Sequence, residues 1–122
     1  MPRALVAVLL LSALAPAGLA AQKEPVEIKL GYFLQGNGYL KLPEAAKGTY
    51  VMGVVDGLLG APVFDAPRKK TVWLEHCIVG MSSEQLAAIV DKYLRENPAQ
   101  WNWAMNVLVY SAMSDACQAY RK

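Results

Sequence analysis

The residues of this chain that could do chemistry are few, and the most suggestive are a histidine and a cysteine side by side. His76 is the only histidine, Cys77 follows it directly, and Cys117 is the only other cysteine. A cysteine beside a histidine could be a nucleophile, a metal ligand or half of a disulfide. The choice among these three depends on the compartment and on the elements that position the two side chains.

Catalysis and metal binding both require more than this pair. A thiol nucleophile needs a base within hydrogen-bond reach and a group that orients the base, and residues adjacent in sequence seldom meet that geometry. One histidine and two distant cysteines match no familiar zinc spacing, since zinc takes about four ligands. The carboxylates are dispersed, and no phosphate loop, catalytic serine motif or cofactor signature is present. We therefore expect no catalytic, cofactor-binding or metal-binding residues and interpret the protein as not an enzyme.

The first residues indicate export. Arg3 precedes an apolar run, residues 4–15, which is followed by a proline and small side chains. This order is typical of a secretory signal peptide, and the run is too short to span a bilayer, which needs about 20 apolar residues. Small residues at Gly18 and Ala20 suit cleavage after residue 20, and an uncleaved anchor is the alternative. We predict a signal peptide over 1–20, a periplasmic protein, and one domain over 21–122.

Composition narrows the range of partners. The chain has 12 Lys and Arg against 10 Asp and Glu, for a formal net charge of +2. Its one basic run, Arg68-Lys69-Lys70, lies in a stretch punctuated by Pro and Gly, so the balance argues against nucleic acid as a partner. We interpret the triplet as a solvated turn, with a docking patch for a protein partner as the alternative.

Export also decides the expectation for the cysteines. Two cysteines in an oxidising compartment normally pair, so we expect a disulfide between Cys77 and Cys117, with His76 as an incidental neighbour near the surface. On the chain-entropy estimate, closing a loop of that length stabilises the fold by about 4 kcal/mol.

The clearest predicted helix runs from Ser83 to about Glu96. Its apolar positions recur at helical spacing, and Ser82 with Gln85 forms the pattern of a capping box. Asn97-Pro98 ends it and begins the next helix, which we expect from Pro98 to about residue 120. An antiparallel pair of helices returns Cys117 to the neighbourhood of Cys77.

This second helix is apolar nearly all round, so it must be central or shared with a partner. Trp101 and Trp103 fall on different faces of it and cannot easily both be buried in one small bundle. We therefore name Trp101, together with Arg68, Lys69 and Lys70, as residues for partner binding. A homodimer could use the same surface.

A third helix is expected from about residue 43 to residue 59. Gly48, Gly53 and Gly57 weaken it, so we expect them to serve close packing of helix backbones, and we place Asp56 at the solvent edge. Residues 28–42 could form a hairpin or a loop, and we favour the loop. Residues 71–77 could be a short strand or a helical turn. The sequence predicts an all-α class: a small helical bundle stapled by one disulfide and preceded by a signal peptide.

One further pattern emerges from the helix with Tyr50 and Gly53, the cysteine ahead of the capped helix GMSSEQL, the pair Asn97-Pro98 and the closing cysteine. Together these resemble the Rap/Tai family of type VI secretion immunity proteins, over about residues 49–117. The resemblance implies a small exported helical protein that binds and occludes a peptidoglycan amidase injected by another bacterium. A periplasmic structural or chaperone-like protein without a toxin partner is the alternative.

Overall fold

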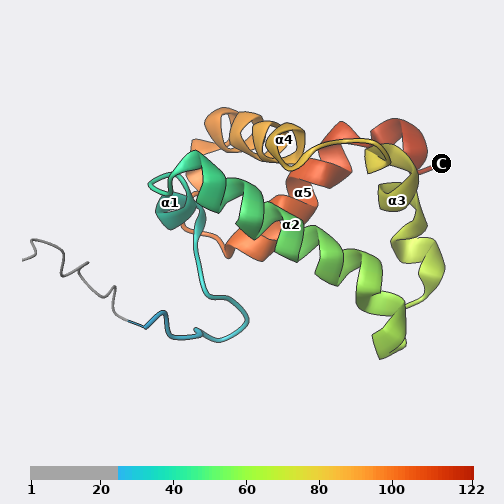
Figure 1. Ribbon diagram of the computed structural model, residues 1–122, viewed down its shortest axis with the longest axis horizontal. Helices are drawn as coiled ribbons and strands as arrows, with labels where there is room; N and C mark the ends of the chain where they lie inside the picture. The colour runs from blue at the N-terminus through green and yellow to red at the C-terminus, as the bar shows by residue number, and fades with distance from the viewer. Residues whose placement is uncertain (1–24) are drawn as a thin grey trace, which may run out of the picture.

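The structure is a computed structural model that describes residues 25–122, so the predicted signal peptide and its cleavage point lie outside the described residues. The described part is helical, with α1 (Gly36–Tyr39), α2 (Glu44–Gly60), α3 (Val72–Ile78), α4 (Ser83–Glu96) and α5 (Met105–Ala116) (Figure 1). Three short 3-10 turns lie between these helices and a fourth follows α5: η1 (Ala61–Phe64), η2 (Arg68–Lys70), η3 (Pro98–Gln100) and η4 (Gln118–Tyr120). The all-α prediction is confirmed.

Helix α4 begins and ends where its sequence predicts. The Ser82 hydroxyl accepts a hydrogen bond from the Gln85 N–H at 3.3 Å, and the Gln85 side chain accepts one from the Ser82 N–H at 2.8 Å. This reciprocal pair is a capping box, and it satisfies backbone donors that the first turn leaves free. The apolar face buries Leu86, Val90 and Leu94.

The core lies where α2, α4 and α5 pack against one another, with α1 and α3 closing its two ends (Figure 1). Each of the three long helices supplies fully buried apolar side chains. The largest of the buried side chains are Tyr39, Leu74, Leu94, Met105, Leu108 and Met113.

The prediction of a helix that begins at Pro98 is wrong. The chain makes the short turn η3, runs irregularly through residues 101–104, and becomes α-helical only at Met105. The irregular segment has partners elsewhere: the Gly36 N–H donates to the Trp103 carbonyl at 3.2 Å, and the Asn37 N–H donates to the Trp101 carbonyl at 2.7 Å. In residues 101–104, hydrogen bonds to a distant segment thus replace the hydrogen bonds that a helix would form within itself.

Consecutive residues of α5 differ sharply in burial. Val107 is 47% exposed, whereas Leu108 and Val109 are fully buried. Helix α4 packs against both α2 and α5, and Leu108 belongs to the core that the three helices share.

Two segments left open by the sequence are now settled. Residues 28–42 form a loop, as favoured, with a tight turn at Leu30-Gly31 and the single helical turn α1. Gly31 adopts a φ of +83°, which glycine takes without strain. Residues 72–78 form the helix α3, so the helical reading of that segment is the correct one.

The expectation for the glycines of α2 is right at one position and wrong at two. A Cβ at Gly48 would lie 3.6 Å from the Cβ of Ser83, so α2 and α4 approach closely there. Added Cβ atoms at Gly53 and Gly57 would meet nothing within 4 Å, because both residues are exposed. Asp56 is exposed, as expected. Within residues 25–122, no helix is long and apolar enough to cross a membrane.

Candidate functional site

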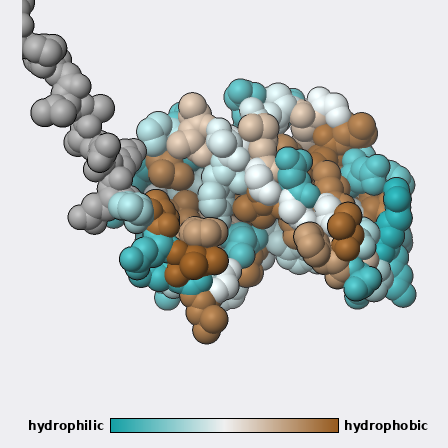
Figure 2. Space-filling view, turned by 60° about the horizontal axis from the view of Figure 1, so that its bottom comes forward, coloured by the Kyte–Doolittle hydropathy of each residue, from teal (hydrophilic) through white to brown (hydrophobic). Residues whose placement is uncertain are grey.

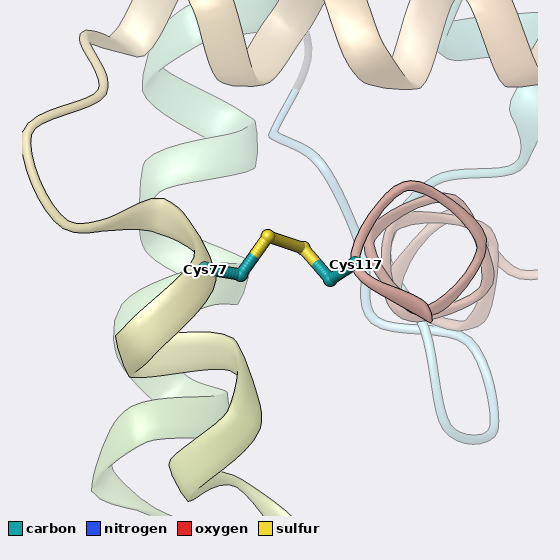
Figure 3. The surroundings of a disulfide bond; sticks show 2 residues. All are labelled: Cys77 and Cys117. Atoms are coloured by element: carbon teal, nitrogen blue, oxygen red, sulfur yellow. A yellow bond between two sulfur atoms is a disulfide. The ribbon is translucent and has the colours of Figure 1, made fainter. Parts of the chain in front are cut away.

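The two cysteines form a disulfide, as predicted. Cys77 belongs to α3 and Cys117 directly follows α5, and their Cα atoms are 5.8 Å apart, an ordinary distance for a bridge (Figure 3). Both cysteines are buried, whereas His76 is exposed. Because both thiols are consumed in this bond, neither is a nucleophile or a metal ligand, and the bridge instead fixes α3 to the end of α5.

The basic triplet lies on the turn η2, immediately before α3. All three of its side chains are exposed. A hydrogen bond ties the turn to the core, because the indole N–H of the buried Trp73 donates to the Lys70 carbonyl at 2.7 Å. Its backbone is therefore held in place while its charges face solvent.

Trp73 also brings the end of the chain to this turn. Its ring meets the ring of Tyr110 edge-on, with centroids 6.0 Å apart, and the Arg121 guanidinium lies 5.0 Å from the Trp73 centroid. Arg68 pairs with Glu75 at 3.6 Å, and both side chains are exposed, so this pair contributes little stability. Sequence reasoning missed Trp73, although the spacing of Trp73, Leu74 and Cys77 is that of one buried helical face.

Trp101 lies at the other end of the molecule, beside α1, whereas the triplet adjoins α3 (Figure 1). Its indole N–H donates to the Leu94 carbonyl at 2.7 Å, in addition to the bond that this carbonyl accepts from the Asn97 N–H at 3.2 Å. Trp101 is thereby tied to the last turn of α4. The side chain is 37% exposed. The four residues predicted to bind a partner therefore do not form one surface.

A charged cluster that the sequence did not reveal lies between α2 and α4. Lys47 is only 8% exposed. Its ammonium group lies 3.1 Å from a carboxylate oxygen of Glu44 and 3.6 Å from one of Asp91, and 5.7 Å from the centroid of the Tyr39 ring. The cluster borders a cleft of about 490 Å³ that is otherwise lined mainly by small side chains. A lysine between Ala46 and Gly48 on a helix was the available signal.

The protonation state of Lys47 indicates that this cluster stabilises the fold and does not take part in catalysis. Burial opposes the charge on Lys47, but the hydrogen bond that its ammonium group donates to Glu44 and the charges of Asp91 and Glu44 outweigh burial, so the pKa of Lys47 is raised. Burial, reinforced by the same two carboxylates, raises the pKa of Tyr39. A lysine that acts as a base or a nucleophile needs a lowered pKa. Lys47 therefore stays protonated and joins α2 to α4.

Among residues 25–122, no group of three or more His, Cys, Asp and Glu side chains is arranged to hold a metal ion. In comparisons with known proteins, no family model, no curated protein and no solved structure matches this chain.

Proposed function

We propose that this protein is exported to the periplasm and acts there as an immunity-type protein, which binds a peptidoglycan amidase of type VI secretion and occludes its cleft. It does so stoichiometrically, without catalysing a reaction. The motifs that resemble the Rap/Tai family support this proposal. The helix of Tyr50, the capped helix α4 and the cystine that those motifs mark all contribute to one packed core.

The observation that carries the proposal is the exposed basic turn on a rigid base. An inhibitor gains affinity when the segment it inserts is already ordered, because less conformational freedom is lost on binding. The Trp73 hydrogen bond and the neighbouring disulfide order the backbone around residues 68–70. Arg68 pairs with Glu75, whereas Lys69 and Lys70 pair with no carboxylate among residues 25–122 and can face an acidic or polar cleft. We assign the turn, rather than Trp101, as the segment that meets the amidase.

The test uses the exported protein and a small secreted amidase encoded beside its gene. We expect a one-to-one stoichiometry of protein and amidase chains and loss of cell-wall hydrolysis in a turbidity assay. The variant Lys69→Glu/Lys70→Glu should weaken binding by about 10-fold or more, since reversing charges at an interface slows association and adds repulsion. Lys92→Glu/Arg95→Glu makes the same change of charge on the exposed side of α4 and should leave affinity within about 3-fold.

Two results would count against the proposal. Equal weakening by both variants would mean that net charge, and not the turn, governs binding. If no neighbouring amidase binds and a deletion strain survives attack by its siblings, the alternative of a structural or chaperone-like periplasmic protein is favoured. The exposed apolar residues Val63, Phe64 and Val79 are the feature that suits that alternative.

A further inference from the structure

A polar hollow of about 460 Å³ lies where the second half of α5, the end of the chain and a side chain of α4 meet. Its walls include Ser114, Asp115, Gln118 and Arg121, with the rings of Tyr93 and Tyr110 beside them. The chain ends next to α3 (Figure 1), and Figure 2 shows hydrophilic residues along this end of the molecule, the end furthest from the grey trace. A site here would therefore take a polar ligand.

Two opposite charges line this hollow without neutralising each other. Asp115 and Arg121 are both exposed, and neither makes an ion pair with the other or with any further residue of the described chain. An anion would be repelled by Asp115 and a cation by Arg121. A neutral ligand would cover both charges and pair with neither, which is unfavourable. The ligand that matches the hollow therefore carries one positive and one negative group.

The cation is held in place by its neighbours. The Arg121 guanidinium donates a hydrogen bond to the Ser114 hydroxyl, and it lies 5.0 Å from the centroid of the ring of the buried Trp73. A guanidinium presents five N–H donors in a planar fork. It can therefore keep its contact with Ser114 and still donate two parallel hydrogen bonds to a carboxylate of a ligand.

The anion is held as well. The Gln118 amide donates to Oδ1 of Asp115 at 3.0 Å, which orients the carboxylate and uses one of its two oxygens. The Arg121 N–H donates to the Gln118 carbonyl at 3.2 Å, and this segment directly follows Cys117, which the disulfide joins to Cys77. Both charges are thus positioned before a ligand arrives, so less conformational freedom is lost on binding.

We propose that this hollow binds a small zwitterion, an amino acid or a short peptide with free ends, whose carboxylate pairs with Arg121 and whose ammonium group pairs with Asp115. The rings of Tyr93 and Tyr110 offer apolar surface to the carbon atoms between the two charges. The Tyr93 hydroxyl donates to the Gln100 side chain at 3.0 Å, which holds that ring in place.

The surroundings leave room for more than a single amino acid. A second hollow of about 270 Å³ adjoins the first, and the two share Tyr93 and Asp115. Ile89 and Ala112 give this second hollow apolar lining, which suits the side chain of a peptide residue. The site shares no residue with the basic turn, so it does not depend on the proposed function.

The test uses the exported protein with two ligands, L-alanine and L-alanyl-L-alanine. We expect the backbone amide signals of residues 111–121 to shift in magnetic resonance spectra and to saturate. The dissociation constant should be about 1 mM, because ion pairs open to solvent are weak. The ligand that binds more tightly tells whether the source is a free amino acid or a peptide. N-acetylated and C-amidated dialanine each lack one charge, and each should bind about 5-fold more weakly.

The two charges of the site should respond separately. Asp115→Asn should weaken binding of dialanine about 5-fold and abolish the preference for a free ammonium group, and Arg121→Gln should do the same for the carboxylate. The matched controls Asp56→Asn and Arg95→Gln remove the same charges elsewhere and should leave the dissociation constant unchanged. All four side chains are exposed, so the variants should fold normally.

Three results would overturn the proposal, and none of them involves an amidase. The first is the absence of saturable shifts with either ligand up to about 20 mM. The second is equal affinity for the free and the blocked dipeptides, since the charges of the ligand would then not be recognised. The third is weakening by the controls as large as that by Asp115→Asn and Arg121→Gln, which would place the effect in the overall charge of the protein.

Discussion

The two ends of this molecule treat the same residue type in opposite ways. At the crossing of α2 and α4, Lys47 is almost fully buried, and it meets two carboxylates within 4 Å. On the turn η2, Lys69 and Lys70 are exposed and pair with no carboxylate among the described residues. A buried ammonium must be neutralised where it lies, whereas an exposed one keeps its charge available to a partner. The first holds helices together, and the second is free to bind.

The ends also differ in what holds them in place. The η2–α3 end is fixed covalently through the disulfide, and the α2–α4 crossing is fixed by packing and by the charged cluster. Changes that remove each device separately therefore test whether the comparison is correct.

The largest effect should follow from removing the disulfide. Cys77→Ser/Cys117→Ser should lower the free energy of unfolding by about 4 kcal/mol, since the bridge closes a long loop in the unfolded chain. Denaturant unfolding of the two proteins measures this difference. Reduction of the wild-type protein should reproduce the loss, and a change below about 1 kcal/mol would show that packing alone fixes α3.

The next effect should come from Lys47. Lys47→Met leaves Asp91 largely buried without its cation, and breaking a buried pair in this way should cost about 3 kcal/mol. Removing both charges in Lys47→Met/Asp91→Leu should recover much of the loss, because no uncompensated charge then remains. Equal losses in the single and double variants would place the stabilisation in the lysine stem and not in the ion pair.

Alkaline pH should lower the stability that the buried groups around Lys47 contribute. The pKa values of Lys47, Tyr39 and Tyr50 are all raised in the folded protein, so these groups hold their protons more tightly there than in the unfolded chain. Their contribution to stability is complete below the unfolded pKa values, at about pH 10, and is lost as pH rises through the folded values. Unfolding free energies measured from pH 8 to pH 12 should fall above pH 10, and a flat profile would contradict the cluster.

Glycine substitutions extend the comparison to packing. At Gly36 an added Cβ would lie 2.8 Å from Cδ1 of Leu108 and 3.1 Å from the Trp101 carbonyl oxygen, so Gly36→Ala should destabilise by about 1–3 kcal/mol. Gly53→Ala meets open space within a helix and should stabilise by about 1 kcal/mol through helix propensity alone. Thermal unfolding of both variants checks the two signs.

Local features made much of this fold predictable. The capping box at Ser82 and the proline after Asn97 bound α4 within its own sequence. The disulfide was predicted from the count of two cysteines together with the predicted export. The start of α5 could not be predicted, because it depends on hydrogen bonds from Gly36 and Asn37, more than 60 residues away. The Lys47 cluster likewise exists only where α2 crosses α4, so no local pattern indicates that Asp91 is its partner.

The smallest change in stability is expected at the basic triplet. A small change would show that these residues are not needed for folding. Lys69→Gln/Lys70→Gln should alter the free energy of unfolding by less than about 0.5 kcal/mol, because exposed charges without partners contribute almost nothing to folding. Arg68→Gln loses only the exposed contact with Glu75 at 3.6 Å, and the same limit applies. If the Lys69 and Lys70 variant instead unfolded as readily as Lys47→Met, the turn would be part of the folded framework. A residue that stabilises the fold cannot be changed without a loss of stability. Residues whose substitution leaves stability unchanged can instead be selected for the charge that a binding partner requires.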